Sequence, residues 1–199
     1  MIQDPDSFSR PLDYDSLFGR RASVEIEIGV GKGMFTRQYA LSHPDLNLIG
    51  IEKSAKWLRH AAIRLEKASV TNVRLFNMCA ETFLREWIPS ESIANFHIYF
   101  PDPWPKRRHH KRRLFQYPLM IELLRALKPD GRIFLATDHE DYLSVILETW
   151  SGFTASGLKV TFGEPGPFVT NFQAKYEKEG RRIFYLQGTK DRQVSLPRL

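Results

Sequence analysis

A glycine-rich loop, Glu27–Gly33, is the first segment of the chain whose residue types suggest chemistry. Three glycines let its backbone turn tightly and come close to a ligand, namely Gly29, Gly31 and Gly33. The dinucleotide-binding fingerprint needs its third glycine at the position that Met34 occupies. The carboxylate of Glu27 would repel a pyrophosphate and attract an ammonium or sulfonium group. The loop therefore predicts either a site for a cationic ligand or a simple structural turn.

Two more polar segments follow the next two apolar runs of the chain. Glu52 comes 19 residues after Gly33, where a carboxylate can accept hydrogen bonds from both hydroxyls of a ribose; otherwise it is a surface acid. Asn77 and Cys79 follow the third apolar run and would line the same pocket beside a base. Because a thiol is a weak donor and acceptor, Cys79 would supply no strong specific contact there, or would serve packing alone.

The segment Phe100–Pro105 contains three prolines at alternate positions, which fix the backbone and forbid a helix. Asp102 lies between two of these prolines, and Trp104 follows it closely. A carboxylate held rigidly beside an aromatic ring is suited to the N–H edge of a purine. The alternative is a proline-rich turn with an Asp that caps it.

The next eight residues, Lys106–Arg113, hold six cations, which equals the net charge of +6 of the whole chain. We call this segment the basic octet. It predicts phosphate binding by Lys106, Arg108, Arg112 and Arg113, with Trp104, Phe115 and Tyr117 as stacking candidates. The alternative is an ordinary solvated surface. The adjacent histidines of the octet point apart on most backbones and have no carboxylate or cysteine at ligand spacing, so no metal is expected.

Two later segments are weaker candidates for substrate contacts. Asp138 ends another apolar run and serves either as a helix N-cap or as a substrate ligand. The hydroxyl of Thr170 and the amide of Gln173 could bind a base or a sugar.

The elements that must position these residues alternate between apolar, β-rich runs and amphipathic stretches, as in βαβ units. Strands are predicted at 24–28, 47–51, 73–77, 93–99, 132–137, 158–162 and 183–187, and helices at 35–41, 54–68, 82–87, 114–127 and 140–150. Ser54 and Thr82 are the predicted N-caps. The fold class is α/β: a single Rossmann-like, doubly wound, mostly parallel seven-stranded sheet with helices on both faces. Ligands bind such sheets beyond the carboxyl ends of the strands.

Length and composition agree with one domain. The chain has 199 residues, of which 42% are hydrophobic, so we expect a domain at 21–199 and an N-terminal arm at 1–20, ordered or flexible. With one cysteine, Cys79, no intramolecular disulfide can form, and a reducing, cytoplasmic setting fits best. Acidic residues near the start argue against a signal peptide, and no apolar run reaches membrane-spanning length.

Together these segments resemble the bacterial tRNA (guanine-N7-)-methyltransferase family, a branch of the class I S-adenosylmethionine-dependent methyltransferases. The resemblance extends from Leu17 to Leu186 and rests on Glu27–Gly33, Gly50–Glu52, Phe100–Arg113, Thr137–Asp138 and Thr170–Lys175. The proline-tryptophan segment with its basic continuation is the most specific of these, since general methyltransferases lack it.

The resemblance implies transfer of a methyl group from S-adenosylmethionine to N7 of a guanosine in the tRNA variable loop, at tRNA position 46. It implies Asp102 as the catalytic residue and a cofactor site made of Glu27, Gly29, Gly31, Gly33, Glu52, Asn77 and Cys79. Substrate contacts are expected from Lys106, Arg108, Arg112, Arg113, Asp138, Thr170 and Gln173. The family usually has Asp at the position of Cys79 and Glu at that of Gln173.

Two other functions remain open at the level of sequence. One is a methyltransferase that acts on another RNA or another base atom, and the other is a non-catalytic tRNA-binding module that keeps the cofactor fold. The expected partners are tRNA and S-adenosylmethionine, without a membrane, and the protein is a monomer or a homodimer.

Overall fold

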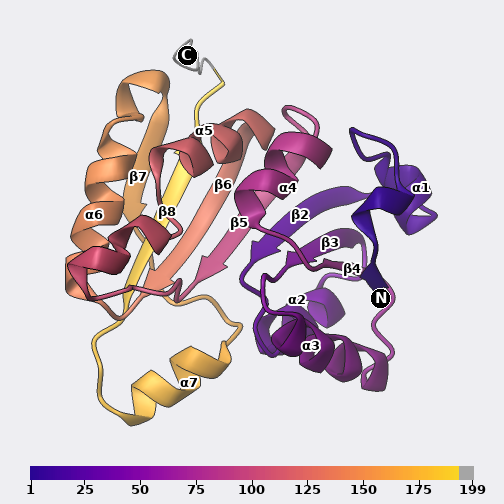
Figure 1. The fold of residues 1–199 in the computed structure, drawn as a ribbon, viewed down its shortest axis with the longest axis horizontal. Coiled ribbons are helices and arrows are strands. Elements are labelled where there is room, and N and C mark those ends of the chain that lie inside the picture. The colour runs from indigo at the N-terminus through magenta and orange to yellow at the C-terminus, as the bar shows by residue number, and fades with distance from the viewer. Residues whose placement is uncertain (193–199) are drawn as a thin grey trace.

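The computed structural model describes residues 1–192, which form one α/β unit around a single sheet (Figure 1). The sheet has eight strands in the order β1-β4-β3-β2-β5-β6-β8-β7. This confirms the predicted Rossmann-like, mostly parallel architecture, with one strand more than expected. The predicted end of the domain at residue 199 lies outside the described residues.

All seven predicted strands are present. They are β2 (Ser23–Ile28), β3 (Leu46–Ile51), β4 (Val73–Phe76), β5 (Ile93–Tyr99), β6 (Leu127–Thr137), β7 (Leu158–Phe162) and β8 (Phe184–Lys190). β8 runs antiparallel to both β6 and β7, between which it lies. The extra strand, β1 (Ile2–Gln3), pairs in parallel with β4. A strand of two residues is too short for the alternation of apolar and polar residues that reveals a strand in a sequence.

The five predicted helices are also present, with shifted ends: α2 (Met34–Ser42), α3 (Ala55–Lys67), α4 (Ala80–Trp87), α5 (Tyr117–Ala126) and α6 (Glu140–Ser151). Ser54 caps α3, since its Oγ accepts from the N–H of Trp57 at 3.5 Å. The predicted N-cap at Thr82 is wrong, because α4 begins at Ala80. Its N-cap is Cys79, whose side chain forms no capping hydrogen bond. Not predicted were α1 (Tyr14–Phe18), α7 (Asn171–Lys178) and the 3₁₀ helices η1 (Pro5–Ser7), η2 (Arg107–Arg112) and η3 (Thr154–Ser156).

Helices cover both faces of the sheet, as predicted. On one face α2 and α3 bury Ala40, Leu58 and Leu65 against β3 and β4. On the other face α4, α5 and α6 pack on Ile26 of β2 and Phe96 of β5. The first 20 residues contribute β1 and α1, whose Leu17 and Phe18 join the second of these cores. No helix within residues 1–192 is long and apolar enough to cross a membrane.

The register of the parallel strands brings their carboxyl ends to one edge. Ile28 pairs with Ile51 of β3 and with Ile98 of β5, and Ile51 pairs with Phe76 of β4. The loops that follow β2, β3, β4 and β5 therefore start at the same level. The candidate residues of the first half of the chain therefore lie at or just after the carboxyl ends of these strands, along one edge of the sheet that we call the active edge.

Candidate active site

The glycine loop after β2 is shaped by three glycines with positive φ, at +87° for Gly29, +54° for Gly31 and +72° for Gly33. L-residues rarely adopt this left-handed backbone. A Cβ on Gly29 would meet no atom within 4 Å, whereas a Cβ on Gly33 would lie 2.8 Å from that of Ala61 in α3. The loop therefore leaves open space beside Gly29, and Gly33 is required by the close packing of α2 and α3.

Glu27 is buried at the end of β2, with 4% of its surface exposed. Its Oε2 accepts a hydrogen bond from the Thr36 hydroxyl at 2.6 Å. Burial raises the pKa of Glu27 to about 8; the Thr36 bond opposes this rise, and the charge of Glu52 adds to it. A cation placed beside Glu27 would favour its ionised form. The buried carboxylate of Glu27 is thus suited to bind a positively charged ligand.

Glu52 joins the glycine loop to the start of α3. Its Oε2 accepts from the Gly31 N–H at 2.9 Å, and its Oε1 accepts from the Ser54 N–H at 2.8 Å. The amide of Asn77 donates to the backbone oxygen of Glu52 at 2.7 Å and to that of Lys53 at 3.0 Å, which ties the end of β4 to the same turn. A carboxylate oxygen can accept more than one hydrogen bond, so Glu52 retains capacity for hydroxyl donors. Cys79 is exposed nearby, where α4 begins.

The proline segment after β5 carries backbone strain on both sides of Asp102. Phe100 has a φ of +51° and Trp104 a φ of +43°, which are uncommon for residues other than glycine. The N–H of Phe100 donates to the carbonyl of Ala136 in β6 at 2.7 Å, and its ring is buried. Asp102 itself is exposed. A strained and anchored loop thus presents one carboxylate to solvent at the active edge.

Arg113 anchors the proline segment from the interior of the protein. It is 5% exposed, its Nε donates to the carbonyl of Pro103 at 2.7 Å, and its guanidinium lies 4.9 Å from the ring centre of Tyr142. The prediction that Arg113 faces a phosphate does not fit this burial. Phe115 is 1% exposed, so its predicted stacking on a base does not fit either.

The rest of the basic octet lies on the surface. Lys106, Arg108 and Arg112 are exposed, and the guanidinium of Arg112 lies 5.1 Å from the ring centre of Trp104. The 3₁₀ helix η2 carries most of these cations. Within residues 1–192 no three His, Cys, Asp or Glu side chains gather as metal ligands.

The loop between β7 and β8 brings α7 to the same edge. Thr170 caps α7, since its Oγ1 accepts from the N–H of Gln173 at 2.9 Å, and both side chains are largely buried. The amide of Gln173 donates to Oε1 of Glu177 at 2.9 Å. The side chain of Gln38 in α2 binds both backbone groups of Val169, at 3.4 and 3.3 Å, and so fixes this loop on α2.

Asp138 is paired with a cation and does not cap a helix. Its Oδ2 accepts from Arg181 at 2.9 Å, whereas Nδ1 of His139 caps α6. Arg181 also lies 4.4 Å from the ring centre of Tyr176. Burial is the main cause of the raised pKa of Tyr176. The charge of Asp138 and, more weakly, that of Asp102 raise this pKa further. Arg181 therefore links Asp138 to Tyr176 of α7.

One further candidate residue was not predicted from the sequence. Phe172 on α7 is 47% exposed, and its ring lies 5.8 Å from Tyr176 and 6.3 Å from Phe100. The spacing of Phe172 and Tyr176, four residues apart, is a helical signal that would have revealed α7. Phe172 offers a flat aromatic surface next to the proline segment.

A buried polar cluster behind the site was also missed. Glu25 of β2 contacts Nε2 of His97 at 2.7 Å and accepts from Tyr39 at 2.8 Å and from Asn95 at 2.7 Å. Burial acts to raise the pKa of Glu25, but the hydrogen bond and charge of His97, with the other bonds, lower it overall. These residues occupy the sheet face that carries Glu27, and their role is to hold β2, β5 and α2 together.

Three features define the chain as a methyltransferase domain of the S-adenosylmethionine-dependent class. They are a Rossmann-like sheet with β8 inserted antiparallel between β6 and β7, a glycine loop after β2 and an acid after β3. Among solved structures, an rRNA methylase from Streptococcus thermophilus has the same fold. It superposes with a TM-score of 0.60 at 15% identity, over 86% of this chain and 88% of that one.

The sequence comparisons define the family more narrowly. The family model described as "Putative methyltransferase" matches residues 21–186, and the chain belongs to this family. The chain is 42% identical over 174 residues to the tRNA (guanine-N(7)-)-methyltransferase of Bordetella pertussis, covering 87% of this chain and 68% of that protein. It is 34% identical over 196 residues to the enzyme of that name from Geobacillus thermodenitrificans, covering 96% and 90%.

The residues at the edge of the sheet fit S-adenosylmethionine. Glu27 forms no ion pair with a cation in the described part of the chain, and its raised pKa indicates that it lacks a charge partner. The open space at Gly29 can receive the ligand, and Glu52 lies at the rim of the same loop. A ligand with an ammonium group, a sulfonium and a ribose matches this set of groups.

Proposed function

We propose that this protein transfers a methyl group from S-adenosylmethionine to N7 of a guanosine in tRNA, in the variable loop at tRNA position 46. The observation that carries the proposal is Asp102, an exposed carboxylate in a strained proline segment, one strand away from the glycine loop. Exposed cations follow it directly in the chain. A cytoplasmic setting fits the tRNA substrate and the single cysteine.

Glu27, Glu52, Cys79 and the glycine loop would each hold a different part of the methyl donor. Glu27 binds the ammonium group, the glycine loop lies along the amino-acid part, and Glu52 accepts from the ribose hydroxyls. Cys79 lies beside the adenine, with Asn77 holding the turn in place. When bound, S-adenosylmethionine supplies a methyl group activated by the positive sulfur. The task of these residues is to fix the position of that group relative to the target base.

Asp102 acts on the guanine. Its carboxylate accepts hydrogen bonds from N1–H and from the exocyclic amine, which points N7 toward the methyl group. N7 already has a lone pair in the ring plane, so attack needs no general base and no protein nucleophile. Transfer of the methyl group to N7 would leave the base with a positive charge. The negative charge of Asp102 offsets this developing charge.

The remaining residues would orient the RNA. Lys106, Arg108 and Arg112 are exposed and contact phosphates, while the ring of Phe172 stacks on the flipped base or its neighbour. Asp138, Thr170 and Gln173 lie at or beside α7 and contact the nucleoside from the other side. Holding both reactants in line converts a two-body step into a one-body step, which can contribute several kcal/mol.

The test is methyl transfer from labelled S-adenosylmethionine to unmodified tRNA, followed by nucleoside analysis. We expect label in 7-methylguanosine, and none when position 46 of the tRNA is adenosine. Label in another nucleoside would identify a different RNA methyltransferase. Binding of tRNA without any transfer would identify a binding module. An Asp102→Asn variant, which keeps the shape of the loop, is the matched control.

A further inference from the structure

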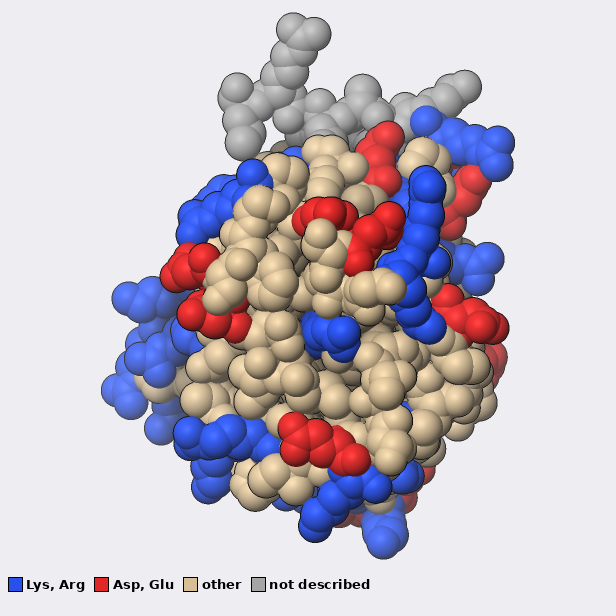
Figure 2. Space-filling model, turned by 90° about the vertical axis from the view of Figure 1, so that its right-hand side faces the viewer, with Lys and Arg blue, Asp and Glu red and all other residues tan. Residues whose placement is uncertain are grey.

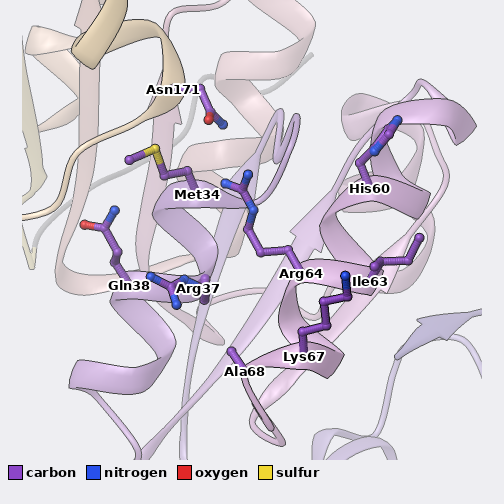
Figure 3. Close-up of a pocket in the computed structure, with 9 residues that line it drawn as sticks. All are labelled: Met34, Arg37, Gln38, His60, Ile63, Arg64, Lys67, Ala68 and Asn171. Atoms are coloured by element: carbon purple, nitrogen blue, oxygen red, sulfur yellow. The ribbon is translucent and has the colours of Figure 1, made fainter.

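A second basic surface lies away from the basic octet, in a groove between α2, α3 and the first residue of α7. The cavity has a volume of about 640 Å³ and is open to solvent. Arg37 of α2, Arg64 and Lys67 of α3 and the imidazole of His60 line it, with the amides of Gln38 and Asn171 at its edge. Figure 3 shows Arg64 extending from α3 toward α2 and Asn171, while Arg37 lies on α2 with its side chain directed away from α3.

The cations of the groove are not balanced within the protein. No Asp or Glu is among the described residues that line it. Arg37, Arg64 and Lys67 form no ion pair with any carboxylate in residues 1–192. By contrast Arg10, Arg85, Arg125 and Arg181, elsewhere on the surface, each have an acidic partner. Three unpaired cations that repel one another across a groove favour an anionic occupant.

The surroundings extend this basic surface toward the active edge. Lys32 of the glycine loop and Lys56 of α3 each lie 5.1 Å from the ring centre of Trp57, which is 36% exposed. Figure 2 views the right-hand side of Figure 1, and its lower part, where α3 lies, carries several Lys and Arg side chains around one acidic patch. Asn171, at the rim of the groove, directly follows the Thr170 cap. The groove therefore connects to the segment that carries the substrate contacts.

We propose that this groove binds the sugar-phosphate backbone of the tRNA, as a second phosphate site built on the sheet face opposite to α5. The inference rests on the proposed function. A row of separate cations with amides between them suits successive phosphates and ribose hydroxyls. The open shape suits a polymer that passes through the groove more than a small molecule that is enclosed in it. The tRNA is then held on both sides of the catalytic edge, by the octet and by the groove.

The test uses the full chain and the double variant Arg64→Ala, Lys67→Ala. Each phosphate contact contributes roughly 0.7 to 0.9 to the slope of log affinity against log salt, so the slope should become shallower by about 1.5. The swap Arg64→Lys, Lys67→Arg keeps both charges and should keep the slope. Arg132→Ala, which removes an exposed cation of β6 outside the groove, is the matched control and should also keep it. Affinity for S-adenosylmethionine and the melting temperature report whether each variant is folded.

The outcomes separate this inference from the proposed function. If the groove variant keeps the wild-type salt slope while Arg108→Ala, Arg112→Ala makes it shallower, the groove is a solvated surface and the inference is overturned. If the wild-type protein transfers no methyl group to tRNA, the proposed function fails first. If the groove variant and the charge-preserving swap both made the salt slope shallower to the same extent, the phosphate contacts would also be refuted. The change in slope would then not depend on charge.

Discussion

The buried carboxylate of Glu27 makes the binding of the methyl donor depend on pH in a direction that the structure specifies. Burial raises its pKa to about 8, so in the free protein the group is mostly protonated at pH 7. An ammonium group binds the ionised form. Binding must therefore release a proton below pH 8, and affinity must rise with pH up to that value.

The magnitude follows from the pKa. At pH 8 about half of the Glu27 side chains are ionised, and at pH 6 about one in a hundred, from a pKa of about 8. About half of the ligand also carries its ammonium proton at pH 8, so affinity for S-adenosylmethionine should fall about 25-fold from pH 8 to pH 6, which corresponds to about 2 kcal/mol. The range ends at pH 8 because the amino group of the ligand loses its own proton above roughly that value.

Calorimetry at pH 6, 7 and 8 in buffers of different ionisation heat measures both the affinity and the proton released. 5′-Methylthioadenosine, which lacks the ammonium and the sulfonium, is the control ligand and should bind with nearly constant affinity. Glu27→Gln should bind S-adenosylmethionine weakly and without pH dependence. A wild-type affinity that changes less than threefold, or a Gln variant with the wild-type pH profile, would refute the role of Glu27.

The same group affects stability with a defined sign. An acid whose pKa is raised on folding keeps its proton in the folded state while the unfolded chain loses it, so stability falls as pH rises from about 4.5 to about 8. Glu27→Gln cannot ionise and should lack this decline. Thermal unfolding of the ligand-free proteins between pH 5 and pH 8 measures the difference, and parallel curves for the two proteins would contradict the burial argument.

Three other variants test the remaining parts of the site. Asp102→Asn should lower single-turnover methyl transfer about 100-fold or more while donor binding survives, and a near-normal rate would exclude its assigned role. Gly33→Ala should lower the free energy of unfolding by about 2 kcal/mol or more, because its Cβ would lie 2.8 Å from that of Ala61. Gly29→Ala has open space and carries only the cost of its φ of +87°, about 1 kcal/mol, and it should lose donor affinity. Arg113→Ala should slow methyl transfer by freeing the Pro103 carbonyl yet leave the tRNA salt slope unchanged; a shallower slope would return Arg113 to the phosphate contacts.

Long apolar runs made most of the fold predictable. Each of the strands β2 to β8 has at least three residues with apolar side chains, and the polar residues after them stand out by contrast. The ends of helices were less accurate, since Cys79 caps α4 without a side-chain bond and gives no signal. α7 was missed because its sequence is mostly polar. It is stabilised by the Thr170 cap and by packing of Tyr176 on Phe100, a contact between distant parts of the chain.

Within the candidate site, residue types were predictable and orientations were not. The composition of the basic octet identified cations but not that Arg113 turns inward to bind Pro103. Arg113 directly follows the 3₁₀ helix η2, where the direction of a side chain depends on tertiary packing. Here the guanidinium of Arg113 packs on the ring of Tyr142. The groove cations lie on two helices separated in sequence, so only the packing of α2 against α3 brings Arg37 near Arg64.

The position of β8 has a consequence for how the protein is made. β6 pairs on one side with β5, which precedes it, but on the other side with β8, whose residues are synthesised about fifty positions later. Until residues 184–190 emerge, one edge of the apolar strand β6 has no partner, and β7 has no strand to pair with. A nascent chain in this state exposes an edge open to pairing with other chains. Insertion of β8 closes that edge and fixes the ends of the loop that carries α7, so this side of the candidate site forms only after β8 has been synthesised.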